Sequence, residues 1–206
     1  MGKTRSKRKT QKQKTLELVQ LSVLVALVVV LQLLSALIPP IGGTVSITLT
    51  LIPVVIGAIL FGKKGGAILG FSFGLIVMIN CITGLDVGGN ILWNANPFLT
   101  GMLCLVKGTL AGWVPAAVYS AITKTKIQSG STVLTAMLAP IVNTSIFVVG
   151  MLLFFRETLS AWAGGEDLIV YILVGLAGVN FLIEFAINML LTPAIIRVVN
   201  VVKKNK

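Results

Sequence analysis

Residues 179–190, which read VNFLIEFAINML, decide the fold because they carry polar groups inside an otherwise apolar run. Asn180, Glu184 and Asn188 recur at every fourth position, so on a helix their side chains share one stripe. A carboxyl group near the middle of a bilayer costs about 2.5–3.5 kcal/mol on insertion scales. The stretch therefore predicts a membrane-spanning helix whose polar stripe faces the interior of a helical bundle rather than lipid.

One other ionisable side chain lies well inside an apolar stretch, that of Lys107, and a third apolar stretch carries Asn143. Polar side chains at membrane depth usually mark a solute path or a binding site. We therefore expect the helices that carry Lys107, Asn143 and Glu184 to line a small solute site.

The composition assigns the chain to the integral membrane proteins. Of its 206 residues, 56% are hydrophobic and 11% are charged, and the mean hydropathy is +0.99. Soluble domains carry about 25% charged residues. The net charge of +11 does not indicate nucleic-acid binding, because the lysines and arginines lie between and outside the apolar runs. We expect contact with a lipid bilayer and no nucleic-acid partner.

Several kinds of chemistry are excluded by the residues that the chain lacks. Histidine is absent, which removes most metal sites and acid–base schemes. Cys81 and Cys104 form no CxxC motif, and we interpret both as packing residues, with a disulfide between helices as the alternative. The lysine-bearing turn 62–66 reads GKKGG, which is not the phosphate-binding loop of an ATPase. We expect no enzymatic activity and no cofactor, which leaves transport or solute capture.

Apolar runs predict an all-α membrane protein, in which residues 15–200 form one domain between basic tails at 1–14 and 201–206. The six predicted spans are residues 18–38, 45–61, 66–82, 99–122, 133–155 and 168–200. The second is short and carries Pro53, so we expect it to be broken or re-entrant. The last is longer than a bilayer core of about 30 Å, so we expect it to tilt, to bend near Pro193 or to project beyond the membrane.

Small residues in the third and fourth spans predict close helix packing. They recur at four-residue spacing as Gly66, Gly70 and Gly74 in one span and as Gly108 and Gly112 in the other. The connection 83–97 between these spans is rich in glycine and asparagine, yet it keeps Trp93 and neighbouring apolar residues. We expect it to fold back onto the protein as a lid that carries Trp93 and Asn94.

The distribution of charge orients the bundle. With the N-terminal tail inside, 15 of the 17 lysines and arginines fall in the two tails and the two inner loops. The outer loops hold Arg156 and four of the six acidic residues. Positive residues accumulate on the cytoplasmic side of membrane proteins. We therefore expect both termini in the cytoplasm, and we expect the chain in a bacterial plasma membrane.

Four features, taken in order, resemble the substrate-binding S component of energy-coupling factor (ECF) vitamin transporters over nearly the whole chain. The first is ITLTLIPVVIGAILFG at 47–62, which leads into GGA at 65–67. The others are Lys107-Gly108, Asn143-Thr144, and Asn180 with Glu184. Together they are most similar to the branch of pantothenate and riboflavin carriers, and Asn143-Thr144 with Glu184 favours the pantothenate type.

This resemblance implies that the chain captures a vitamin from outside, while a transmembrane scaffold subunit and two ATPase subunits supply the energy. In the family, small residues on the first helix dock on the scaffold. The corresponding positions here are Ser22 and Ala26, with serine in place of the first alanine. Small side chains allow the backbone of another helix to approach closely.

The predicted site places Lys107 against a substrate carboxylate, with Asn143, Asn180 and Glu184 hydrogen-bonded to amide or hydroxyl groups. Counted from the outer ends of the helices, Lys107 lies about 10 Å deep and the other three residues lie about 18–24 Å deep. An elongated ligand, or the flexible side chain of Lys107, must therefore bridge this difference in depth. Alternatively, Lys107 pairs with Glu184 or extends to the surface.

Two other functions fit the same residues. An ion-coupled secondary transporter would use Glu184 as its proton site. A non-transport scaffold subunit would use the asparagines and Glu184 only to join helices, and it would bind no vitamin.

Overall fold

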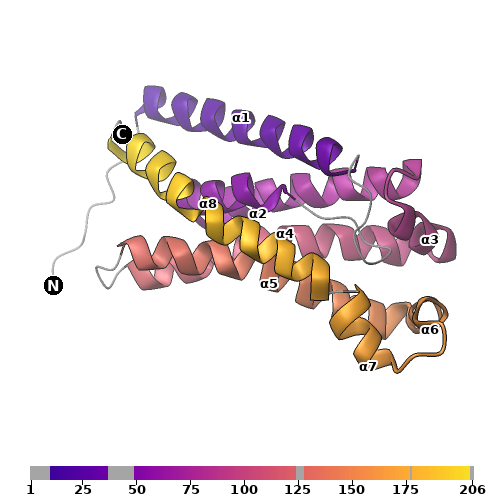
Figure 1. The fold of residues 1–206 in the computed structure, drawn as a ribbon. Helices are drawn as coiled ribbons and strands as arrows, with labels where there is room; N and C mark the ends of the chain where they lie inside the picture. The colour runs from indigo at the N-terminus through magenta and orange to yellow at the C-terminus, as the bar shows by residue number, and fades with distance from the viewer. Residues whose placement is uncertain (1–9, 37–48, 124–127, 177, 205–206) are drawn as a thin grey trace, which may run out of the picture.

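The computed structural model describes residues 10–36, 49–123, 128–176 and 178–204, and these residues are almost entirely helical, without a strand (Figure 1). In chain order the helices are α1 (Gln11–Ala36), α2 (Leu51–Thr83), α3 (Val87–Ala95), α4 (Pro97–Ile122), α5 (Gln128–Phe154), α6 (Arg156–Ala163), α7 (Leu168–Val170), the π-helix η2 (Tyr171–Leu176) and α8 (Gly178–Lys204). Residues 1–9 of the predicted basic tail lie outside this description.

Within the described ranges, five helical segments are long and apolar enough to cross a membrane. They are Gln11–Ala36, Leu51–Thr83, Pro97–Ile122, Gly130–Phe154 and Leu168–Val202. The second contains a reversal and therefore holds two of the predicted spans, so the prediction of an all-helical membrane bundle is confirmed.

The reversal in α2 lies at Gly62, whose φ of 67° and ψ of −157° are not helical. A positive φ of this kind strains any residue with a Cβ, so glycine is required here. Beyond Gly62 the chain reverses its direction. The evidence for this reversal is that the side chain of Leu69 packs against Gly57. In an uninterrupted helix these two residues would be about 18 Å apart. The first arm, 51–61, and the returning arm, 63–83, thus correspond to the second and third predicted spans.

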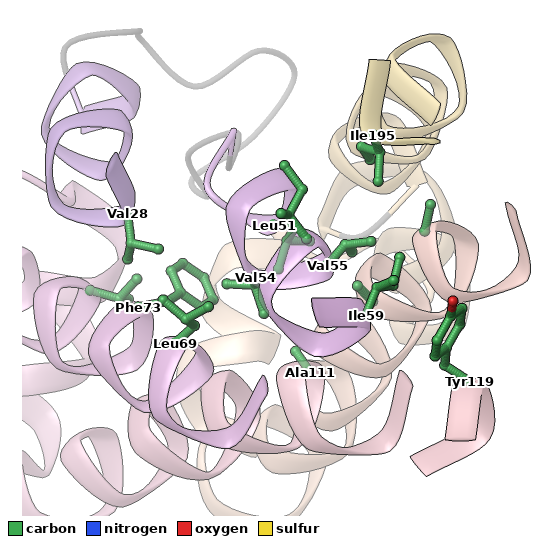
Figure 2. Packing of buried hydrophobic residues seen from close by; sticks show 14 of the residues in the cluster. Val28, Leu51, Val54, Val55, Ile59, Leu69, Phe73, Ala111, Tyr119 and Ile195 are labelled. Carbon is green, nitrogen blue, oxygen red and sulfur yellow. The ribbon is translucent and has the colours of Figure 1, made fainter. Parts of the chain in front are cut away.

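The first arm of α2 is the centre of the bundle. Leu51, Val54 and Val55 are fully buried, and Figure 2 shows Val54 close to Leu69 and Phe73 of the returning arm, with Val28 of α1 beside Phe73. Pro53 does not break this arm. It lies in the first helical turn, where the backbone N–H has no intrahelical acceptor. The helix begins at Leu51, and residues 45–48 of the predicted span lie outside the described part of the chain.

Glycines hold the returning arm of α2 against α4. A Cβ built on Gly66, Gly70 or Gly74 would collide with the carbonyl oxygen of Gly112, Gly108 or Cys104, respectively. The residue numbers of the contacts on α4 fall as those on α2 rise, so the two helices are antiparallel. The packing role expected of these glycines is confirmed, and it requires the absence of side chains on both helices.

The charged side chains separate toward the two ends of the bundle. Figure 1 places the C-terminal end of α8 and the end of α4 at one end, and α3, α6 and α7 at the other. The second end, which we call the acidic end, carries Asp86, Glu157, Glu166 and Asp167. Toward the first end lie Lys12, Lys14, Lys63, Lys64, Arg197 and Lys204. This separation fits the charge alternation along the sequence.

The last predicted span is interrupted near its start. It is divided into α7, the π-helix η2 and α8, whereas α8 continues through Pro193 to Lys204. A Cβ on Gly178 would collide with the Leu173 carbonyl oxygen, so glycine is needed where η2 gives way to α8. The irregular backbone therefore lies at this junction and not at the proline.

Candidate functional site

A cavity of about 30 Å³ lies at the acidic end of the bundle, between the two hydrophobic clusters of the protein. Five helices and the turn before α3 contribute to its wall, which consists of Val77, Cys81, Asp86, Gly88, Gly89, Leu92, Thr100, Leu103, Cys104, Lys107, Phe147 and Trp162. Val77 and Cys81 belong to the central cluster, whereas Leu92 and Leu103 belong to the cluster under α6. We call this space the Lys107 cavity.

Lys107 is the cation of the cavity. Side chains on a helix tilt toward its N-terminus, and α4 begins beside α3, so Lys107 extends toward the acidic end. Its Nζ lies 4.9 Å from the centre of the Phe147 ring on α5. A cation over an aromatic face is stabilised by the ring quadrupole while its N–H groups stay available to a ligand. Among the described residues, the ammonium group of Lys107 therefore contacts the Phe147 ring.

Two further polar groups of the wall are held by the backbone. The Asp86 carboxylate accepts a hydrogen bond of 3.1 Å from the Gly89 N–H and thereby caps α3. The hydroxyl of Thr100, a residue that is almost completely buried, donates to the Asn96 carbonyl oxygen at 2.9 Å. Both oxygens keep acceptor capacity toward the cavity.

Helix α3 borders the cavity through residues other than Trp93 and Asn94, and its role as a lid stays a prediction. Gly88, Gly89 and Leu92 line the cavity. Trp93 packs outside it, where its ring would lie 3.6 Å from a Cβ on Gly101 of α4. Asn94 is exposed and donates to the Asn90 Oδ1 at 3.1 Å. The prediction that Trp93 and Asn94 contact substrate thus remains a prediction.

Asn143 does not line the cavity, but it lies one helical turn before Phe147, on the same face of α5. It is 6% exposed, and within the described part of the chain its Oδ1 has no hydrogen-bond partner. A buried polar atom without a partner costs about 1–3 kcal/mol. Asn143 therefore offers a buried acceptor one helical turn from Phe147.

Glu184 and Asn188 are buried in α8 and do not line the Lys107 cavity. The Asn188 amide donates to the Glu184 carbonyl oxygen at 2.9 Å, and the Thr192 hydroxyl donates to the Asn188 carbonyl oxygen at 2.7 Å. The polar stripe predicted from the sequence therefore does face inward. The side chain of Asn180 is not among those that the structure describes.

The three consecutive polar residues of α5, Asn143, Thr144 and Ser145, face two different surfaces. Asn143 points into the bundle, whereas Thr144 and Ser145 line an apolar groove between α5, η2 and Phe181 of α8. The hydroxyl groups of the triplet therefore do not face the Lys107 cavity.

The predicted docking residues lie on the outer face of α1. Ser22 and Ala26 are both exposed, and large apolar side chains such as Val23, at 62% exposure, flank them. The Ser22 hydroxyl donates to the Leu18 carbonyl oxygen at 2.9 Å, so this polar group is satisfied within the helix.

Comparison with known proteins agrees with this architecture. A family model described as "ECF transporter, substrate-specific component" matches residues 16–196. The chain is also 27% identical over 205 residues to the pantothenic acid transporter PanT of Lactococcus lactis subsp. cremoris (strain MG1363). This alignment covers 95% of this chain and 99% of PanT. The resemblance inferred from the sequence is thereby confirmed: this membrane protein belongs to the family of substrate-specific components of ECF transporters and is a transporter component rather than an enzyme.

Proposed function

We propose that this protein binds pantothenate in the Lys107 cavity and delivers it to an ECF energising module. The observation that carries the proposal is the ammonium of Lys107 in the wall of a cavity that α3 borders. The likeness to PanT supports the choice of ligand. Pantothenate carries a carboxylate, an amide, two hydroxyl groups and a gem-dimethyl group, so it needs one cation, several hydrogen-bonding groups and an apolar surface.

Each part of the ligand has a complementary group in or beside the wall. The carboxylate pairs with Lys107, since a charge-assisted hydrogen bond is strongest where water is excluded. The amide or a hydroxyl group donates to the unpaired Oδ1 of Asn143. The gem-dimethyl group packs against the apolar wall, where Trp162 and Leu92 face the cavity.

Binding requires the cavity to open, because its volume of about 30 Å³ is far below the roughly 300–1,000 Å³ of typical ligand pockets. Helix α3 is the element suited to this movement. It follows Gly84, which has a φ of 80°, and Asn90 fastens it to α2 through a hydrogen bond of 2.8 Å to the Cys81 carbonyl oxygen. Opening also gives an elongated ligand access to the deeper side chains, and we assign Asn180 and Glu184 to that part of the site.

The remaining assignments concern the membrane and the partners. The acidic end faces outward from a bacterial plasma membrane and both termini face the cytoplasm, in line with the position of the basic residues. The scaffold subunit docks on α1 around Ser22 and Ala26, and two ATPase subunits bound to that scaffold supply the energy. The exposed apolar face of α1 supports this location.

The test is ligand binding by the purified full-length protein in detergent. We expect pantothenate to co-purify in native mass spectrometry and to bind saturably in calorimetry, with one ligand per chain. Riboflavin and folate are the comparison ligands. A folded protein that ignores pantothenate, or prefers riboflavin or folate, would contradict the proposed function.

A further inference from the structure

The returning arm of α2 and the helix α4 share one exposed apolar face. Their large exposed apolar side chains recur every three, four or seven positions, so on each helix they form a single stripe. The stripe of the arm consists of Ile68, Phe71, Leu75, Ile79 and Ile82, and that of α4 consists of Phe98, Met102, Val106 and Trp113. We call these two stripes together the α2–α4 face.

This face points away from the rest of the bundle. Phe71 and Trp113 each follow, by one residue, a glycine of the contact between the two helices. Because the helices are antiparallel, residues in this position turn to the same side of the pair. The other side carries Leu69, which packs against the first arm of α2, and Lys107, which contacts α5. The α2–α4 face is therefore open to the lipid around the bundle.

Two lysines lie where this face reaches the basic end of the bundle, opposite the acidic end. Lys64 is exposed and precedes Ile68 by one helical turn, so it continues the stripe of the arm. The Nζ of Lys63 lies 5.6 Å from the centre of the ring of Trp113, a residue that is 42% exposed. The ring quadrupole holds this ammonium group at the edge of the face, while its N–H groups stay available to a ligand.

The length of the arm places both ammonium groups at the border between lipid headgroups and acyl chains. From Lys63 to Thr83 the helix rises about 30 Å, and the hydrocarbon core of a bilayer is also about 30 Å thick. Thr83 is followed by α3 at the acidic end, so the two lysines lie at the opposite border. Lysine and tryptophan at such a border reach the headgroup layer.

The edge of the face is cationic. Of the six acidic residues of the chain, four lie at the acidic end, Glu184 is buried in α8, and Glu17 belongs to α1, which packs on the bundle side of the arm. A second helix would need small residues in order to pack closely in a membrane, whereas both stripes consist of large side chains. A phosphate joined to flexible acyl chains suits this surface better.

We infer that the α2–α4 face binds an anionic phospholipid. The phosphate accepts hydrogen bonds from the ammonium groups of Lys63 and Lys64, and the acyl chains lie along the two stripes. A zwitterionic lipid binds more weakly, because its own ammonium group offsets the charge of the phosphate. None of these residues lines the Lys107 cavity, so the inference does not rest on the proposed function.

The charge preference is tested by native mass spectrometry of the full-length protein in detergent, titrated with dioleoylphosphatidylglycerol or dioleoylphosphatidylcholine. We expect the first phosphatidylglycerol to bind at least ~10-fold more tightly than phosphatidylcholine, and Lys63→Gln/Lys64→Gln to reduce this ratio to within about twofold. Lys12→Gln/Lys14→Gln removes the same charge from α1 at the same end and should keep the ratio. Equal affinities of the original protein for both lipids, or an equal loss in the α1 variant, would overturn the inference.

The position of the lipid is tested by tryptophan fluorescence of the full-length protein in phosphatidylcholine vesicles. We expect a small fraction of phosphatidylglycerol with brominated acyl chains to quench more strongly than the same fraction of brominated phosphatidylcholine. Trp113→Leu and Lys63→Gln/Lys64→Gln should each abolish this difference, since the other two tryptophans, Trp93 and Trp162, lie in α3 and α6 at the acidic end. Equal quenching by the two lipids, or a difference that survives Trp113→Leu, would contradict the site.

Discussion

Lys107 and Asn143 are the residues on which the proposed recognition depends, and the sequence identifies both because each places a polar group inside an apolar helix. Their partners could not be found in that way. Phe147 and Trp162 look like any aromatic residue of a membrane helix or its border, and only the register between helices brings them to the cavity. Asp86 carries a local signal, since an Asp three residues before Gly89 is a typical helix N-cap, but that signal predicts a helix and not a cavity.

Asn143→Leu tests the unpaired Oδ1. The substitution removes a buried acceptor that lacks a partner, so we expect thermal stability in detergent to rise by about 1 kcal/mol. If that oxygen accepts a hydrogen bond from the ligand, pantothenate affinity should fall ~5–10-fold in calorimetry.

The matched control is Asn188→Leu, because Asn188 is also buried with an unpaired Oδ1 but lies away from the cavity. Its affinity for pantothenate should stay within about twofold of the original value. An unchanged affinity in the Asn143 variant would remove that residue from the site.

At the level of helices, the apolar runs predict the five segments of the described residues that are long and apolar enough to cross a membrane, because burial in lipid requires long apolar stretches whatever their packing. Hydropathy does not report backbone conformation. It therefore does not predict η2, where the last span changes to a π-helix. The glycine spacing does predict the α2–α4 contact, since only residues without side chains allow that approach.

Gly70→Ala tests this contact. The added methyl group would collide with the Gly108 carbonyl oxygen, so the two helices must separate, and we expect a loss of about 1–3 kcal/mol in stability. Ser72→Ala, on the same arm but away from α4, should change stability by less than about 0.5 kcal/mol. The measurement is thermal unfolding in detergent, and equal melting temperatures of the Gly70 variant and the original protein would contradict the close packing.

For the whole molecule, the described residues place the Lys107 cavity at the acidic end and leave a long apolar helix, α1, largely exposed along the bundle. Charge alternation predicts which end faces outward, because it depends only on the number of crossings. The size of the cavity could not be predicted, since it results from how α3 packs between α2 and α4.

Ala26→Trp tests whether α1 is the docking face. A bulky side chain there prevents close approach of a partner helix, so vitamin uptake by cells that carry the complete complex should fall at least ~10-fold. Calorimetry should show pantothenate affinity within about twofold of the original, since α1 does not line the cavity. Leu182→Trp, on the exposed face of α8, is the control and should leave uptake intact. Loss of uptake in the control but not in the Ala26 variant would place the partner on α8.

The most direct test of the central claim compares Lys107→Ala with the original protein on two ligands, pantothenate and panthenol, in which an alcohol replaces the carboxylate. If Lys107 binds the carboxylate, the substitution should weaken pantothenate binding ~10–150-fold in calorimetry, because a hydrogen bond to a charged group contributes about 1.5–3 kcal/mol. Panthenol affinity should change by less than about threefold, and Lys64→Ala should affect neither ligand. An equal loss for both ligands, or no loss for pantothenate, would contradict the account.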